Sequence, residues 1–296
     1  MNIQELQHEI ATMLRDFSDA PQLDAQRIIL HVLKKNDASY LLSHGDEIFS
    51  DADLETMLER AEKRKIGMPL AYIVGQADFY GRTFFVTQDV LIPRPDTELL
   101  IEKTLKYIQN NFDTDQDVLI ADVCTGSGCI AITLALELPH ARIIATDISP
   151  AAIEIAKRNA KQHGVLDRIE FLHGDMFDAF SPPARGGVSP AFGGVSGGGR
   201  KVDLIVSNPP YVTTQELLTI RHPGLDPGST SNDESGFPIK SGMTTNDTIG
   251  LLFEPKIALD GGEDGLKFVN QIKEYSKKHS IPAIIETVGG EIITVY

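Results

Sequence analysis

Residues 117–136 read DVLIADVCTGSGCIAITLAL, which predicts a strand, a glycine turn and a helix in that order. The apolar run Val118 to Val123 is typical of a buried parallel strand. The turn Thr125-Gly126-Ser127-Gly128 follows it, and a helix is expected from about Ile130. Glycines let the backbone approach a ligand, and a helix N-terminus adds N–H donors. The stretch therefore predicts a binding turn at the end of a sheet strand.

Beyond this turn the chain alternates strands and helices. A second strand is expected at Arg142 to Ala145, before Asp147, and a third at Ile169 to Leu172, before Gly174-Asp175-Met176-Phe177. The alternation predicts a doubly wound parallel sheet. A carboxylate at Asp147 can take both hydroxyls of a ribose. Asp175, taken alone, fits a turn carboxylate as well as a site residue.

Residues 202–212 read VDLIVSNPPYV and predict a rigid shelf at the end of another strand. Two prolines must end the strand, because neither can donate to a sheet ladder. The Asn208 side-chain oxygen and the Pro209 carbonyl can each accept an N–H from a planar group bearing an NH2, and Tyr211 can pack on its flat face. Fixing such a weak nucleophile in line with a reactive carbon can contribute about 7–11 kcal/mol. Asn-Pro alone would indicate only a turn.

Two cofactor classes are compatible with the glycine turn. The run from Gly126 to Ala131 with Asp147 also fits the dinucleotide fingerprint, so an NAD enzyme is an alternative. No acid–base His or Tyr partner stands out, and the Asn208 shelf needs a reactive carbon rather than a hydride. S-adenosylmethionine offers an adenosine for Asp147 and Asp175 and a methyl group for the shelf.

The chain before residue 99 predicts two smaller parts. Apolar residues recur at helical spacing up to about residue 65, which predicts a helical bundle. Aromatic and β-branched residues cluster at 69–98, punctuated by Gly75 and Gly81, which predicts a β-hairpin linker there, with Asp96 or Thr97 capping the next helix. We therefore expect a helical domain at 1–68, the linker at 69–98 and the α/β domain at 99–296.

Composition narrows the class of protein. The 296 residues carry a net charge of −15, which argues against a phosphate-binding surface and so against direct nucleic-acid binding. The two cysteines and the scattered histidines indicate no disulfide framework and no metal site. No signal peptide or membrane span is evident, so a cytoplasmic protein is expected.

Three motifs together resemble the HemK-type family, the methyltransferases that modify the GGQ-motif glutamine of class I peptide chain release factors. They are Ile92 to Glu98 (IPRPDTE), Asp122 to Gly128 (DVCTGSG) and Asn208 to Tyr211 (NPPY). The resemblance covers roughly residues 1–270 and includes the helical domain, the hairpin and the glycine-rich phrase from Glu254 to Leu266.

The resemblance implies a seven-stranded Rossmann-like domain that uses S-adenosylmethionine and releases S-adenosylhomocysteine. It implies that the cofactor is bound by Cys124, Thr125, Gly126, Ser127, Gly128, Asp147 on the ribose, Asp175 with Met176 near the adenine, and Asn208. It implies that Asn208 and the Pro209 carbonyl hold the glutamine amide, with Pro210 and Tyr211 beside it. The helical domain would help to dock the release factor, and a monomer is expected.

The sequence departs from the family pattern in four places. Cys124 stands where the family usually has glycine. Two polar tracts, 181–201 and 221–250, have linker composition, and we expect flexible inserts there. Ile281 to Thr287 and Glu291 to Tyr296 predict two last strands, where the family continues with a helix and a closing strand.

Other functions remain open from the sequence. The same shelf suits a glutamine of a ribosomal protein, or an amine of a DNA or RNA base. The two tracts and the shortened end also fit a degenerate, non-catalytic binding module. Arg94 and Glu98 could line the substrate entrance or belong to a structural ion pair.

Overall fold

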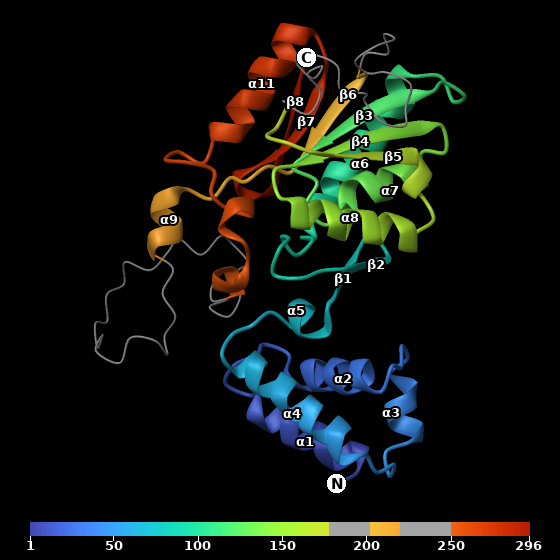
Figure 1. Cartoon of the computed structure of the whole chain (residues 1–296), viewed down its shortest axis with the longest axis vertical. Helices are drawn as coiled ribbons and strands as arrows, with labels where there is room; N and C mark the ends of the chain where they lie inside the picture. Colours follow the sequence, from blue (N-terminus) through green and yellow to red (C-terminus); the bar gives the residue numbers. More distant parts are fainter. Residues whose placement is uncertain (178–201, 220–249) are drawn as a thin grey trace. The chain divides into compact units, whose positions relative to one another are not determined.

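The computed structural model describes residues 1–177, 202–219 and 250–296 (Figure 1). The predicted inserts at 181–201 and 221–250 therefore lie outside the described residues, apart from Gly250. The chain divides into two compact units, which we describe one at a time: residues 1–76 with 219–253, and residues 77–218 with 254–296. The functional division at residues 68 and 98 stays a prediction.

The first unit is helical, as the apolar spacing predicts. Its described helices are α1 (Ile3–Met13), α2 (Pro21–Val32), α3 (Ser39–Ser43), α4 (Asp51–Lys65), α5 (Leu70–Val74) and the 3-10 turn Leu251–Phe253. The Asn2 side chain and Glu5 form a capping box on α1, and Ser50 caps α4. Apolar stripes of α1, α2 and α4 form one core.

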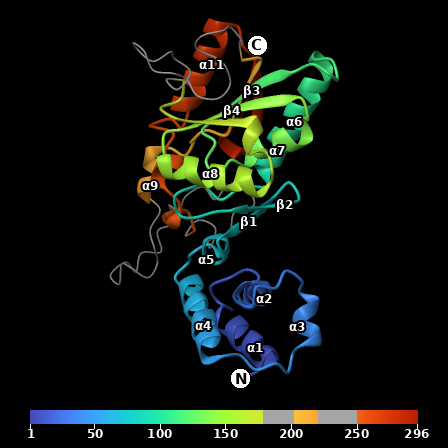
Figure 2. The same ribbon diagram turned by 45° about the vertical axis from the view of Figure 1, so that its right-hand side comes forward.

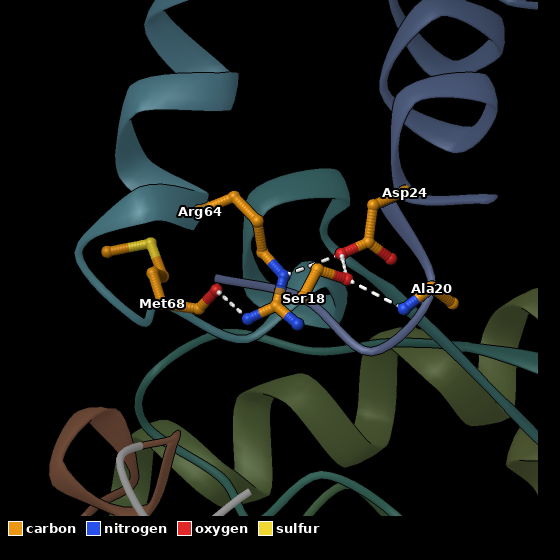
Figure 3. Close-up of polar contacts among 5 residues, drawn as sticks. All are labelled: Ser18, Ala20, Asp24, Arg64 and Met68. Carbon is orange, nitrogen blue, oxygen red and sulfur yellow. Dashed lines mark hydrogen bonds and ion pairs between the residues drawn. The ribbon is translucent and has the colours of Figure 1, made fainter. Parts of the chain in front are cut away.

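A buried ion pair joins two helices of this unit (Figure 3). Arg64 Nε on α4 donates to Asp24 Oδ2 on α2 at 2.7 Å, and the Ser18 hydroxyl donates to the same oxygen. Arg64 Nη1 also donates to the Met68 carbonyl, just after α4. Both charges are largely shielded from water, and each has the opposite charge and one neutral polar group as partners.

The segment 69–98 is only partly the predicted hairpin. Its hairpin is short, with β1 (Gln76–Phe79) and β2 (Arg82–Phe85), and helix α5 precedes it. The residues of α5 have strand-like side chains, but Pro69 starts a helical turn before them. Helix α6 (Asp96–Asn111) has Pro95 at its N-cap and no side-chain cap. The expectation that Asp96 or Thr97 caps this helix is therefore wrong, because both lie inside its first turn.

The second unit is built on a six-stranded sheet in the order β5-β4-β3-β6-β7-β8 (Figures 1 and 2). Its strands are β3 (Val118–Val123), β4 (Ala141–Asp147), β5 (Ile169–His173), β6 (Leu204–Ser207), β7 (Ala283–Thr287) and β8 (Glu291–Val295). All neighbours are parallel except β7 and β8, which pair antiparallel. The doubly wound sheet and the last two strands are confirmed, but this sheet has six strands among the described residues rather than the implied seven.

Helices cover both faces of this sheet. The other helical elements are α7 (Cys129–Glu137), α8 (Pro150–Gln162), α9 (Thr214–Thr219), α11 (Lys267–His279) and the 3-10 turns Leu166–Arg168, Lys256–Ala258 and Val288–Gly290. Ile120 packs with α6 and α7 on one face, whereas Ala121 and Val123 pack with α11 on the other. The strand order reverses between β3 and β6. Open α/β sheets bind ligands at such a point, beyond the carboxyl ends of the strands.

Candidate active site

A cavity of about 940 Å³, its open mouth included, lies at the carboxyl ends of β3, β4 and β6. It is lined by most of the residues that the sequence singles out, namely Cys124, Thr125, Gly126, Ser127, Asp147, Asp175, Met176, Asn208 and Pro210. Gly128, Pro209 and Tyr211 are not among its lining residues. The glycine turn and the Asn208 shelf, which are about 80 residues apart in sequence, therefore share one cavity.

The glycine turn is fixed from both sides. The Thr125 N–H donates to the Thr146 carbonyl at 2.9 Å, and the Gly126 N–H donates to Asp147 Oδ2 at 2.9 Å. Gly128 adopts a φ of 81° and is the N-cap of α7. A Cβ on Gly128 would lie 3.0 Å from that of Ala156 in α8, so this glycine lets two helices pack.

Asp147 has free acceptor capacity in the cavity. Oδ1 accepts the Ser149 N–H at 2.9 Å, and Oδ2 accepts that of Gly126. Burial raises the pKa of this carboxyl, and the backbone N–H groups of Ser149, Gly126 and Ile148, together with His173, oppose that rise. A carboxylate has about four acceptor positions, so at least one remains for a ribose hydroxyl.

Asp122 lies beneath the turn and is fully buried. Its Oδ2 accepts the Thr125 hydroxyl at 2.5 Å and the Ala131 N–H at 3.2 Å. Its Oδ1 has no hydrogen-bond partner among the described residues. Burial raises the pKa of Asp122 to about 7, so this carboxyl changes charge near neutrality.

Two other cavity residues have unusual backbones. Cys124 has a φ of 63° and Met176 a φ of 45°, in the region that glycine favours. Cys124 Sγ lies 3.7 Å from Met176 Sδ, and burial raises the pKa of the thiol. Cys124 therefore has the left-handed conformation that glycine adopts more readily.

The shelf is anchored on both sides of Asn208. The Ser207 hydroxyl donates to the Val123 carbonyl at 2.5 Å, which ties the end of β6 to β3. Asn208 Nδ2 donates to Thr97 Oγ1 in α6 at 2.9 Å. Within the described residues, neither Asn208 Oδ1 nor the Pro209 carbonyl accepts a hydrogen bond. Both oxygens thus remain available as acceptors.

Tyr211 is held by a different part of the fold. Its hydroxyl donates to Glu286 Oε1 on β7 at 3.3 Å. Burial and the Glu286 carboxylate raise the pKa of this phenol. The proposed place of Tyr211 beside a substrate amide stays a prediction.

The fold adds contacts that sequence spacing cannot show. Arg94 lines the cavity and forms an ion pair with Glu254, which is 160 residues away and almost wholly buried. Glu98 instead accepts the Tyr80 N–H at 2.8 Å and is not among the lining residues. Thr97, considered earlier only as a helix cap, is a cavity residue bonded to Asn208.

Comparisons with known proteins agree with this geometry. Residues 5–75 match the model described as "PrmC N-terminal domain", and residues 120–187 match that described as "Methyltransferase domain". Three relatives carry the name "Release factor glutamine methyltransferase". That of Chlorobaculum tepidum is 39% identical, over 74% of this chain and 70% of its own. That of Bacillus cereus is 36% identical, over 83% of this chain and 71% of its own. That of Clostridium acetobutylicum is 31% identical, over 94% of this chain and 82% of its own.

Two kinds of feature are absent from the described residues. No helix there is long and apolar enough to cross a membrane. No group of three or more His, Cys, Asp or Glu side chains in the same part of the chain is arranged to hold a metal ion.

Proposed function

The chain belongs to the release factor glutamine methyltransferases. From this premise we propose that it methylates the side-chain amide nitrogen of the GGQ-motif glutamine in class I peptide chain release factors. The methyl donor is S-adenosylmethionine. The observation that carries the proposal is that Asn208 lines the same cavity as the glycine turn and Asp147. Hydrogen-bond acceptors for a substrate amide therefore lie in the same cavity as a binding site for a nucleoside.

The cavity fits S-adenosylmethionine on two counts. A Cβ at Gly126 would meet no protein atom within 4 Å, so the space above this residue is open. Asp147 retains an acceptor position for a ribose hydroxyl. We therefore assign the donor to the backbone of Cys124 to Gly128, to Asp147, and to Asp175 with Met176. When bound, S-adenosylmethionine supplies a methyl carbon attached to a sulfonium, which a nitrogen can attack.

The chain's own residues then bind and orient the substrate amide. Asn208 Oδ1 and the Pro209 carbonyl each accept one amide N–H, which fixes the plane of the group and the direction of its lone pair. The two prolines hold this shelf rigid, so the orientation costs little entropy at the moment of reaction. No side chain needs to act as a base, because the proton can leave after the nitrogen has been methylated.

Three parts of the proposal go beyond the cavity. Docking of the release factor by the helical unit, a monomeric state and a cytoplasmic location stay predictions. The net charge of −15 supports a protein substrate over a nucleic acid.

The test follows transfer of a labelled methyl group to a release factor added to a cell extract, with and without prior nuclease treatment. We expect label on the release factor and none on a variant whose GGQ glutamine is replaced by glutamate. Label that appears only on nucleic acid or on ribosomal protein would refute the proposed substrate.

A further inference from the structure

The bond between Asn208 and Thr97 bears on how the shelf works, and its interpretation rests on the proposed function. Asn208 presents two chemically different ends, an oxygen that accepts and an NH2 that donates. Only the oxygen can hold an amide N–H of the substrate. The NH2 end must therefore face elsewhere, toward an acceptor of its own.

Thr97 supplies that acceptor. Its Oγ1 lies 2.9 Å from Asn208 Nδ2, and the residue is 2% exposed. Its backbone is fixed too, because the Thr97 N–H donates to the Arg94 carbonyl at 3.1 Å in the first turn of α6. Both Thr97 and Asn208 line the cavity. The acceptor is thus preorganised at the place where the substrate amide is proposed to bind.

We infer that Thr97 is a positioning residue, which sets the orientation of the Asn208 amide so that its oxygen faces the substrate. Without the Thr97 hydroxyl, the NH2 group of Asn208 has no acceptor. The side-chain amide can then rotate so that its NH2 group, rather than its oxygen, faces the substrate. Two NH2 groups would then face each other. The loss falls on the methyl-transfer step, since Thr97 acts through Asn208 and not on the methyl donor.

The test compares two threonine-to-valine changes on the same helix. Thr97→Val removes the acceptor at nearly constant volume. Thr104→Val is the matched control, because Thr104 is equally buried but donates to the Leu100 carbonyl of its own helix at 2.8 Å. Thr97→Ser restores the hydroxyl.

We expect kcat for methylation of the release factor to fall about tenfold in Thr97→Val, the loss of one useful hydrogen bond. The Kd for S-adenosylmethionine should stay within about twofold of the wild type. Thr97→Ser should recover most of kcat, and Thr104→Val should leave it unchanged. Thr97→Ala serves as a second variant if valine impairs folding, as judged from thermal unfolding.

Three results would overturn the inference. They are an unchanged kcat in Thr97→Val and Thr97→Ala, an equal loss in Thr104→Val, or a loss confined to the affinity for the methyl donor. The activity of the wild type distinguishes failure of this inference from failure of the proposed function. A wild-type enzyme that does not methylate the release factor refutes the function itself, whereas an active wild type with an indifferent Thr97 refutes only the positioning role.

Discussion

Replacing Gly128 by alanine tests how the binding turn is built. Gly128 has a φ of 81°, a conformation that costs an L-residue about 1–2 kcal/mol. The added Cβ would lie 3.0 Å from Ala156 Cβ and 3.2 Å from Ala156 Cα. Ala156 Cα is part of the backbone of α8, so it cannot move aside as a flexible side chain would. Such overpacking costs about 1–3 kcal/mol. The two costs together predict a loss of about 2–5 kcal/mol in the free energy of unfolding.

Gly126→Ala is the matched control. Gly126 also has a positive φ, of 54°, but a Cβ there would meet nothing within 4 Å. Only the conformational cost of about 1–2 kcal/mol applies, and the methyl group enters the cavity instead. Urea unfolding of both variants without ligand measures stability, and calorimetry measures S-adenosylmethionine binding.

We expect Gly128→Ala to lose more stability and Gly126→Ala to lose affinity at a smaller cost in stability. Equal stability losses in the two variants would refute the argument that α7 and α8 need the close approach at Gly128. If Gly126→Ala binds S-adenosylmethionine with normal affinity, the methyl donor does not occupy the open space above the turn, and that assignment is refuted.

Three further predictions concern single residues that line the cavity or lie beneath its glycine turn. Asp147→Asn should weaken S-adenosylmethionine binding by about tenfold or more, because hydrogen bonds to a charged acceptor are lost, and calorimetry will show this. Asp122 has a folded-state pKa of about 7, above its ordinary value, so the wild type is most stable below about pH 4, where the carboxyl is protonated, and loses stability progressively as the pH rises from 4 to 7. The stability of Asp122→Asn relative to the wild type should therefore increase between pH 4 and pH 7, by up to about 4 kcal/mol, in urea titrations at each pH. Cys124→Gly should stabilise the protein by about 1 kcal/mol in thermal unfolding, because glycine accepts the φ of 63° without strain; lower stability would show that the contact with Met176 outweighs the strain.

Local sequence patterns predict the scaffold of the site well. The turn after Val123 and the shelf at Asn208 each follow a strand directly, and Asp147 is the last residue of β4. In a parallel sheet the strands all end on one side, so these residues converge without any long-range information. The helical unit is predictable for a similar reason, since its core follows from the helical spacing of apolar residues.

Contacts between distant segments could not be predicted in this way. Thr97 and Asn208 are 111 residues apart, and nothing in the local pattern of either indicates their hydrogen bond. The pairing of Arg94 with Glu254 is equally remote in sequence. Helix α5 was missed because its aromatic and β-branched residues favour a strand, whereas the turn at Pro69 determines the outcome.

Peptide mass spectrometry of a class I release factor tests the central claim most directly. The factor is incubated with S-adenosylmethionine and either the wild-type chain or Asn208→Ala, and donor binding is measured in parallel by calorimetry. We predict one added methyl group on the GGQ glutamine with the wild type and none with Asn208→Ala, although both bind the donor with similar affinity. An unmodified glutamine with the wild type, or normal methylation by Asn208→Ala, would contradict the account.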